Sequence, residues 1–284
     1  MPQVTTGYDL TFVGHLSKDI NVFPSGKKEV VPGGGVYYGA FAASALGCRC
    51  AIITKVAEKD KSLFQELEKF NIHVIWNSSH VTTSIENVYP SANPDERKSR
   101  MISRAEPFRI DDLKLNSSLV HITPLWYGEF PENLLLEIKK MGVIISIDAQ
   151  GFLRNVSKAG EMFYKVPSDF DNTLKLVDIF KLDIKEGKVL TGLEDPEKIL
   201  KVVESMGPSE IVLTQNSGVF IRRNGRNFFA QFGRYDIKGR TGRGDTCIAA
   251  YLCLRNKESD DEKLVKTVAE IVTKKLQKPG PYMG

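Results

Sequence analysis

The residues best suited to chemistry lie in one short glycine-rich segment, residues 239–247, with the sequence GRTGRGDTC. Apolar residues follow from Cys247 onward, which indicates a helix that begins near Asp245. The first amides of a helix lack intrahelical acceptors and lie at the positive end of its dipole, so Gly242 and Gly244 would expose an anion pocket there. In that pocket Asp245 is either a helix cap or a general base beside a bound anion, and the local sequence allows both roles.

A second glycine-rich segment, residues 32–47, has the sequence PGGGVYYGAFAASALG. Three glycines before a helix of small residues allow a ligand or another chain to approach the backbone closely. The small residues of the helix also fit tight packing against a neighbouring element. The chain has neither the dinucleotide-binding GxGxxG after its first strand nor the phosphate-binding GxxxxGK[ST], so both standard nucleotide motifs are missing from the sequence.

Both segments are embedded in an alternation of short apolar strands and helices. Strands that are apolar throughout belong to a sheet covered by helices on both faces, which predicts a mainly parallel, doubly wound α/β fold. Ligands of such sheets bind beyond the carboxyl ends of the strands. The expected strands are residues 9–13, 51–56, 119–122, 143–148, 177–182 and 211–214, and the expected helices are residues 36–46, 61–70, 132–141, 185–190, 196–206, 245–255 and 260–276.

Two half-polar stretches interrupt this alternation. Residues 20–31 and 84–103 each fit a β-hairpin with a turn in its middle. On pattern alone, the two hairpins are either a small lid over the sheet or ordinary surface hairpins. Gln150 and Arg154 follow the strand 143–148, and they likewise either face the ligand side of the sheet or lie in a surface turn.

Composition excludes several classes of protein. The 284 residues carry 39 Lys and Arg against 35 Asp and Glu, and a net charge of +4 without a basic cluster argues against a nucleic-acid partner. No apolar run is long enough to span a bilayer, and the N-terminus lacks the basic and apolar regions of a secretory signal, so we expect no membrane partner and a cytoplasmic location. The spacing of Cys48, Cys50, Cys247 and Cys253 favours free thiols over a metal site or disulfides.

Together the two glycine-rich segments resemble the paired signatures of the ribokinase-like, or PfkB-type, carbohydrate kinases. The first matches the family's di-glycine motif, which ends in Leu46-Gly47, and the second matches its C-terminal signature, which ends in Gly-x-Gly-Asp at Asp245. The resemblance extends from about Asp9 to the last helix. It implies a single three-layer α/β/α kinase domain over residues 1–284, with lid insertions at about residues 20–32 and 83–105.

The resemblance also implies a role for each matching residue. Asp245 would accept the proton of the attacking hydroxyl, and the amides of Gly242, Arg243 and Gly244 would stabilise the charge on the transferred phosphoryl group. ATP and Mg²⁺ are the implied cofactors, with the ion held through its waters by two carboxylates. These carboxylates are Asp183 and Glu186, the other donor-binding residues are Thr214, Gln215, Asn216 and Gly218, and the substrate-binding residues are Asp19, Gly34, Gly35, Tyr38 and Gln150.

Several positions depart from the family pattern. Gly239 and Arg240 replace the Asp and Thr that open the C-terminal signature, and Arg243 replaces its Ala, which could add a cation near the transferred phosphate. Asp183 replaces an Asn, and the nucleotide loop 213–218 is one residue short. Tyr38 stands where many sugar kinases carry an Asn, so it changes the sugar pocket directly.

The leading prediction is an ATP-dependent kinase that phosphorylates a hydroxyl of a small polyol, namely a sugar, a sugar acid or a cyclitol such as inositol. The alternatives are a nucleoside kinase, a sugar-phosphate kinase and a non-catalytic polyol- or nucleotide-binding regulator on the same fold. A sugar phosphate would need extra cations near the lid, which Lys18, Lys27, Lys28, Arg100 and Arg104 could supply. Activation by a monovalent cation and a homodimer through the lid edges are left open.

Overall fold

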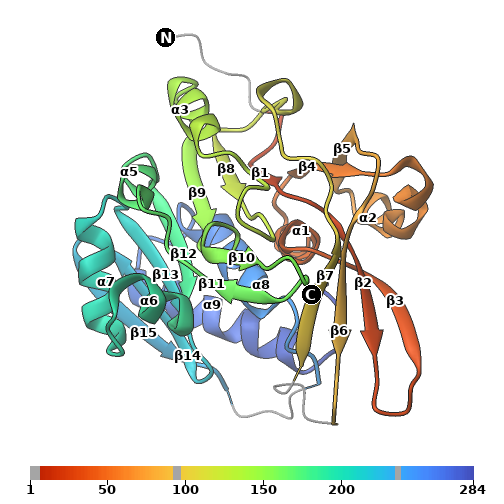
Figure 1. Cartoon of the computed structure of the whole chain (residues 1–284). Helices are drawn as coiled ribbons and strands as arrows, with labels where there is room; N and C mark the ends of the chain where they lie inside the picture. The colour runs from red at the N-terminus through yellow and green to blue at the C-terminus, as the bar shows by residue number, and fades with distance from the viewer. Residues whose placement is uncertain (1–6, 92–96, 234–237) are drawn as a thin grey trace.

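A nine-stranded sheet forms the centre of the computed structural model, which describes residues 7–91, 97–233 and 238–284 (Figure 1). Its strands follow the order β15-β14-β13-β12-β9-β8-β1-β4-β5. Neighbours from β13 to β5 pair in parallel, whereas β14 and β15 extend one edge as antiparallel strands. The bounds are β1 Leu10–Val13, β4 Cys50–Val56, β5 His73–Ser78, β8 Leu119–Ile122, β9 Ile144–Asp148, β12 Ile179–Asp183, β13 Glu210–Thr214, β14 Gly218–Arg223 and β15 Arg226–Gln231.

Helices cover both faces of this sheet. One face carries α1 (Gly35–Ala45), α8 (Arg243–Leu254) and α9 (Asp261–Leu276), whose buried residues share one apolar cluster with the sheet. The opposite face carries α3 (Asn133–Lys140), α5 (Phe170–Leu174), α6 (Ile184–Thr191) and α7 (Pro196–Ser205), which pack on a second cluster. Across the described ranges, no helix is long and apolar enough to cross a membrane.

Successive residues of the parallel strands point into opposite layers. Phe12 belongs to the cluster under α1 and α8, and the next residue, Val13, belongs to the cluster under α3. Likewise Ile179 and Phe180 of β12 face opposite sides of the sheet. Because both faces are covered, these strands are apolar throughout, and the predicted doubly wound α/β fold is confirmed.

Some elements differ from the sequence prediction. The expected helix 61–70 is a 3₁₀ helix, Glu58–Phe64, followed by the single turn α2, Glu66–Lys69. Phe64 at the end of the 3₁₀ helix and Leu67 in α2 are both fully buried and belong to the apolar cluster under α1. The prediction also omitted β5 and the edge hairpin β14–β15. Exposed and buried residues alternate along β15, as is typical of an edge strand covered on one face.

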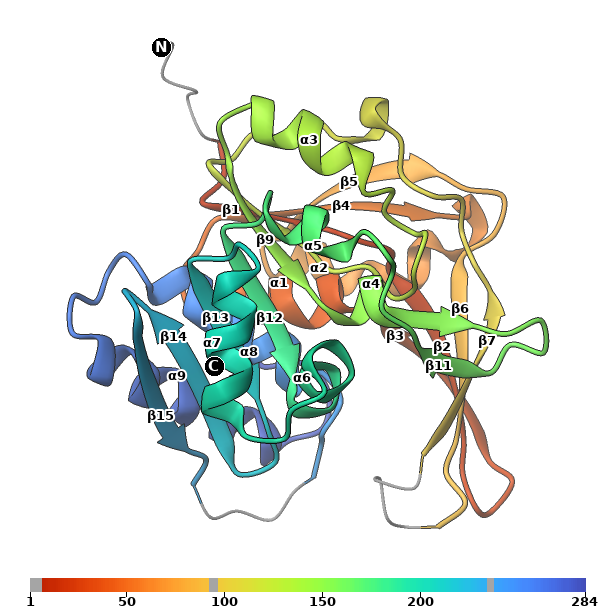
Figure 2. The same cartoon turned by 60° about the vertical axis from the view of Figure 1, so that its left-hand side comes forward.

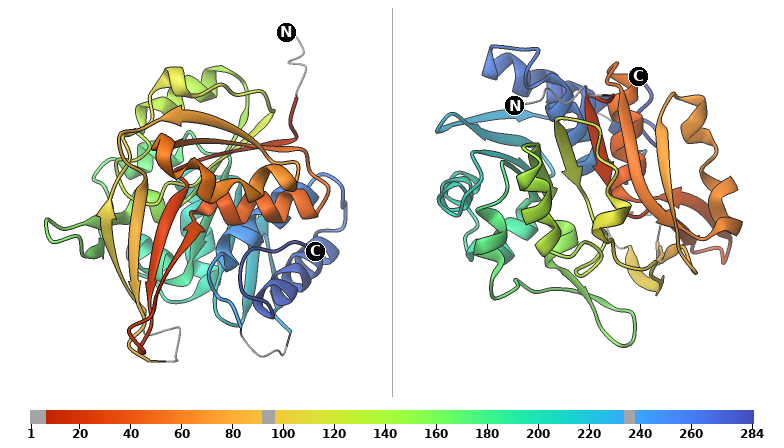
Figure 3. Two further views of the ribbon diagram at one scale, coloured as in Figure 1. Left: turned by 90° about the vertical axis from the view of Figure 1, so that its right-hand side faces the viewer. Right: turned by 90° about the horizontal axis from the view of Figure 1, so that it is seen from above.

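The two half-polar hairpins join into one four-stranded sheet, with the order β3-β2-β6-β7 (Figure 2). Its strands are β2 (Ser17–Val22), β3 (Lys28–Gly33), β6 (Thr83–Val88) and β7 (Lys98–Ser103), and β2 and β6 pair in parallel at its centre. In the left view of Figure 3 these red and yellow strands run side by side away from the central sheet. The expected turn between β6 and β7 includes residues 92–96, which lie outside the described residues. We call this four-stranded sheet the lid.

A buried polar cluster at His15 ties the base of the lid to the core. The amide of His15 donates to Glu129 Oε1 at 2.7 Å, its Nδ1 lies 2.9 Å from Thr83 Oγ1, and its Nε2 lies 3.2 Å from the carbonyl oxygen of Glu106. These contacts join the entry to β2, the start of β6 and the segment after β7. Burial lowers the pKa of His15 to about 3, so this histidine is neutral and structural.

Candidate active site

The two glycine-rich segments meet at Asp245. A Cβ atom built on Gly35 would lie 2.9 Å from Asp245 Oδ1 and 2.2 Å from Thr123 Oγ1. A Cβ atom on Gly242 would lie 2.3 Å from the ring of Tyr38. Only glycine allows this approach, so the tertiary fold brings together two motifs that are far apart in the sequence.

Asp245 does not cap its helix. Helix α8 begins at Arg243, two residues earlier than predicted, and its N-cap is Gly242 in the left-handed region at φ 83°. Asp245 is therefore the third residue of the first turn. Asp245 keeps partial access to solvent, whereas Thr246 to Cys253, which follow it in α8, are buried. A carboxylate that is partly accessible and not used as a cap is free to act on a ligand.

The surroundings of Asp245 suit a general base. Burial raises its pKa, the nearby carboxylate of Asp148 adds to the rise, and Lys181 opposes it, which leaves a pKa of about 6. A base is most effective when its pKa lies close to the working pH, so this carboxylate is both ionised and basic near neutrality.

This pKa predicts the acid side of the pH profile. We expect log kcat/KM for the acceptor to fall with unit slope below about pH 6, because protonated Asp245 in the unliganded enzyme cannot accept the hydroxyl proton. Activity is thus present above this pKa and lost as the pH falls through it. Steady-state rates over a pH series test this, and a kcat/KM that stays flat well below pH 6 contradicts it.

One of the three amides predicted to face an anion at the start of α8 has an acceptor within the protein. The amide of Arg243 donates to the carbonyl oxygen of Arg240 at 3.1 Å. The amides of Gly242 and Gly244 have no backbone acceptor among the described residues. These two amides lie at the positive end of the helix and are available to an anion, and the role of the Arg243 amide stays a prediction.

The side chain of Arg243 points instead toward the expected nucleotide loop. Its Nη1 donates to Asn216 Oδ1 at 3.1 Å. That loop is a tight turn between β13 and β14, in which the amide of Gln215 donates to the carbonyl oxygen of Gly218 at 3.0 Å. Thr214 is buried at the end of β13, opposite Asp183 in the parallel register. The predicted donor residues thus lie together beside the anion pocket.

Asp183 and Glu186 form a reciprocal capping box at the start of α6. The amide of Asp183 donates to Glu186 Oε2 at 2.7 Å, and the amide of Glu186 donates to Asp183 Oδ1 at 2.8 Å. Burial raises the pKa of Glu186. Each carboxylate keeps one oxygen outside the box, and this fits a magnesium ion that retains its waters better than direct coordination. Throughout the described parts of the chain, no group of three or more His, Cys, Asp or Glu side chains is arranged to hold a metal directly.

A row of hydrogen-bonded polar side chains lies on the lid around Asp19, which the sequence predicts to bind the substrate. Ser17 Oγ donates to Asp19 Oδ1 at 2.7 Å, and Asn87 Nδ2 donates to Asn21 Oδ1 at 3.2 Å and lies 3.4 Å from Asp19 Oδ2. Ser99 Oγ donates to Asn87 Oδ1 at 2.6 Å. This row alternates donors and acceptors, as recognition of a ligand with several hydroxyls requires.

Asp19 is the single carboxylate of that row. Burial raises its pKa, and the hydrogen bond from Ser17 and the charge of Arg97 oppose the rise. A Cβ atom on Gly33 would lie 2.8 Å from the carboxylate, so the glycine segment closes over Asp19. Gly34 and Gly35 continue that segment toward Asp245, and the buried Tyr38 ring lies over Gly242.

Arg154 lies on the side of the sheet that carries the predicted site. Its guanidinium lies 5.5 Å from the centre of the Trp126 ring, and its charge acts to lower the pKa values of both Asp19 and Asp245. Gln150 begins the single-turn helix α4 (Gln150–Leu153), and its amide donates to Asp148 Oδ1 at 2.9 Å. The backbone of Gln150 thus fixes Asp148 from the carboxyl end of β9.

Several residues of the site escaped the sequence prediction. Lys181, which has apolar neighbours on both sides in β12, lies 2.9 Å from Asp148 across the parallel pair β9–β12. A lysine between apolar residues of a strand was the sequence feature that could have indicated this site residue. Arg97, which precedes β7 of the lid, donates to Thr241 Oγ1 at 3.5 Å, so the edge of the lid contacts the loop before α8.

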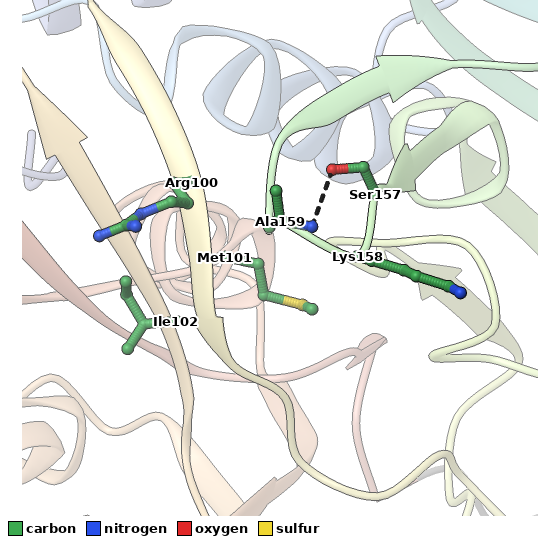
Figure 4. Close-up of a pocket in the computed structure, with 7 residues that line it drawn as sticks. Arg100, Met101, Ile102, Ser157, Lys158 and Ala159 are labelled. Atoms are coloured by element: carbon green, nitrogen blue, oxygen red, sulfur yellow. Dashed lines mark hydrogen bonds between the residues drawn. The ribbon is translucent and has the colours of Figure 1, made fainter.

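A pocket of about 330 Å³ elsewhere on the lid is not this site. It lies between β7 and the turn of the hairpin β10–β11 (Arg154–Val156 and Met162–Tyr164), where the amide of Met101 donates to the carbonyl oxygen of Gly160 at 3.0 Å. Figure 4 shows Ser157 turned toward the amide of Ala159, 3.2 Å away, rather than into the pocket. The hairpin therefore supports the edge of the lid.

We compared the sequence and structure of the chain with those of known proteins. No family model matches the chain. A pyrophosphate-dependent kinase in the ribokinase family, solved as a sulfate complex, is 40% identical, with a TM-score of 0.89 over 96% of this chain and 97% of its own. The chain belongs to the ribokinase family. It is therefore a kinase, as its resemblance to the carbohydrate kinases of this family predicted.

Three further proteins are similar to the chain. A pyrophosphate-dependent kinase complexed with a pyrophosphate analog and myo-inositol is 39% identical, with a TM-score of 0.88, over 96% of this chain and 97% of that one. In a third structure, 38% identical with a TM-score of 0.87 over 96% and 95%, exchange of one asparagine and one serine for leucine converts a pyrophosphate-dependent myo-inositol-1 kinase into a myo-inositol-3 kinase. The cytidine kinase of Thermococcus kodakarensis is only 22% identical, over 96% of this chain and 98% of its own length.

Proposed function

We propose that this kinase phosphorylates a hydroxyl of a cyclitol such as myo-inositol and takes the phosphoryl group from inorganic pyrophosphate. The observation that carries this proposal is the pairing of a polyol row on the lid with an anion pocket at the start of α8, in a chain 39% identical to a pyrophosphate-dependent kinase bound to myo-inositol. The single-domain boundaries, the cytoplasmic location and a homodimer through the lid stay predictions.

The charges of the lid support an unphosphorylated acceptor. Three of the lid cations that a sugar phosphate would need form ion pairs with carboxylates instead. Asp19 would also repel a phosphate group at the centre of the polar row. These observations favour a neutral polyol over a sugar phosphate. The pairs are Lys18–Asp60 at 3.1 Å, Lys27–Glu29 at 2.6 Å and Arg100–Glu86 at 3.0 Å.

The donor side supports pyrophosphate over the ATP implied by the family resemblance. In the expected nucleotide loop the side chain of Asn216 is held by Arg243, and the amide of Gln215 is held by Gly218, so two groups expected to bind the nucleotide have partners within the protein. Arg243 and Lys181 place two cations near the anion pocket, where the short, highly charged pyrophosphate needs them most. ATP remains the second candidate, because Thr214 and Asp183 lie side by side where the resemblance locates the nucleotide phosphates.

The proposed reaction is a direct phosphoryl transfer. Asp245 takes the proton of the acceptor hydroxyl, the hydroxyl oxygen forms a bond to the terminal phosphorus, and the bridging P–O bond breaks so that its electrons leave with inorganic phosphate. The amides of Gly242 and Gly244 stabilise the charge on the transferred group. Mg²⁺, held through water by Asp183 and Glu186, would neutralise the donor charge. The closed lid excludes water, which would otherwise hydrolyse the donor.

We assign the choice of hydroxyl to Asn87 and Ser99. These residues are direct partners in the β6–β7 register, and the 2.6 Å hydrogen bond between them lies next to Asp19 on the polar row. An asparagine and a serine also set the product of the myo-inositol-1 kinase described above. The orientation of the cyclitol against this pair would decide which hydroxyl meets Asp245.

A donor-by-acceptor panel tests this function. The purified protein, with Mg²⁺, is given pyrophosphate or ATP and a series of inositols, sugars, sugar acids, nucleosides and sugar phosphates, and phosphorylated product is measured directly. We expect turnover of an inositol with pyrophosphate. Turnover with ATP alone would overturn the proposed donor, and preference for a nucleoside or sugar phosphate would overturn the acceptor. Binding of a donor and a polyol, without turnover of any donor–acceptor pair, would favour the alternative of a non-catalytic regulator.

A further inference from the structure

Lys181 is a buried cation for which the proposed chemistry has so far no use. It lies in β12, is 6% exposed, and its Nζ lies 2.9 Å from Asp148 Oδ2 on the neighbouring strand. The two residues are direct partners in the parallel register, so the backbone itself holds them together. Asp148 is held in turn by the amide of Gln150.

The ammonium group of Lys181 lies directly beneath the anion pocket. A Cβ atom on Gly244 would lie 2.9 Å from Lys181 Nζ, so the first turn of α8 passes close to the ammonium group. The ion pair with Asp148 gives the buried ammonium the partner of opposite charge that a buried charged group needs. A full charge therefore lies next to the amides that face the phosphoryl group.

The ammonium group of Lys181 has fewer hydrogen-bond partners than that of Lys55, another buried lysine. An ammonium has three donor hydrogens, and within the described part of the chain Asp148 is its one partner at hydrogen-bond distance. Lys55, which is 5% exposed, pairs with Asp112 at 2.7 Å and also donates to the carbonyl oxygen of Pro107 at 3.0 Å. A buried ion pair adds little stability over an apolar pair, so stability alone does not explain a partly bonded lysine at this place.

We propose that Lys181 binds the donor: its ammonium, fixed by Asp148, adds its charge to the amides of Gly242 and Gly244 and holds the phosphoryl group that is transferred. The inference rests on the proposed phosphotransferase function, but not on which donor is used, because the transferred group of pyrophosphate and of ATP occupies the same pocket. In a site closed from water, a charge at such short range acts strongly on the bound anion.

Binding measurements on variants test this role without turnover. Calorimetry measures the affinity of Mg²⁺-imidodiphosphate, a pyrophosphate analogue that resists transfer, and in parallel that of myo-inositol. We expect Lys181→Met to weaken the analogue about 10- to 100-fold, as expected for the loss of a charge-assisted hydrogen bond. Myo-inositol binding should stay within about twofold, and Lys181→Arg should recover part of the donor affinity.

Two further variants distinguish a loss of donor binding by Lys181→Met from a loss of folding. Lys181→Met leaves Asp148 buried without its partner, so the double variant with Asp148→Asn removes both charges and restores the fold, yet it should bind the analogue as weakly as the single variant. Lys55→Met, at the comparison ion pair with Asp112, should leave both affinities unchanged.

The outcomes distinguish the two proposals. Unchanged analogue affinity in the double variant, or equal loss of analogue and myo-inositol affinity, overturns the role of Lys181. If the wild-type protein binds a non-hydrolysable ATP analogue and not imidodiphosphate, the proposed donor fails, and the same comparison on the ATP analogue still decides the role of Lys181. If it binds neither, both proposals fail.

Discussion

Asp245→Asn is expected to lower kcat by about 10²- to 10⁴-fold, the range that a positioned general base contributes. Asparagine has nearly the same size and keeps the hydrogen-bonding oxygen, but it cannot accept the hydroxyl proton at neutral pH. The fold should persist because Gly242, not Asp245, is the N-cap of α8. Single-turnover measurement of phosphorylated product, together with a thermal melt, would test both statements.

A matched control for this substitution is Asp260→Asn. Asp260 also stands at the start of a helix, where its carboxylate accepts hydrogen bonds from the amides of Glu262 and Lys263 at the N-terminus of α9. The substitution removes the same charge from a capping position outside the site, so we expect normal turnover. Asp245→Asn activity within about tenfold of the wild type would show that Asp245 is not the base.

Asp19→Asn is expected to raise KM for the polyol about 10- to 100-fold, with a smaller change in kcat. The substitution removes the charged acceptor at the centre of the polar row, and hydrogen bonds to charged groups contribute roughly 1.5–3 kcal/mol. The amide would also turn a donor toward Ser17 or Asn87, which now donate to the carboxylate or lie within reach of it. Steady-state kinetics at saturating donor give the two constants separately.

Asp60→Asn is the matched control for Asp19. Asp60 pairs with Lys18, the residue before Asp19, at 3.1 Å. The pair is outside the polar row, so its loss should leave the polyol KM unchanged while removing one carboxylate near the same strand. If Asp19→Asn lowers kcat and leaves KM unchanged, Asp19 does not bind the ground-state polyol and the orientation of the acceptor must be revised.

The sequence by itself determined the class of the fold and the family resemblance. Apolar strands between amphipathic helices are local patterns, and they predicted the covered, mainly parallel sheet because a strand covered on both faces has no polar side. The glycine segments around Gly35 and Gly242 were also recognisable from sequence. Where a neighbouring group approaches the backbone closely, only glycine fits, so such a position can be recognised in the sequence from its glycine.

Only the tertiary structure decided which side chains share the site and in what state. Asp245 could be a cap or a base until the start of α8 at Arg243 excluded the cap. The partnership of Lys181 with Asp148 depends on the register of two parallel strands, and the row from Asp19 to Asn87 depends on the pairing of two hairpins distant in sequence. Such contacts, and the burial that shifts a pKa, are set by long-range packing, of which a local sequence pattern carries no trace.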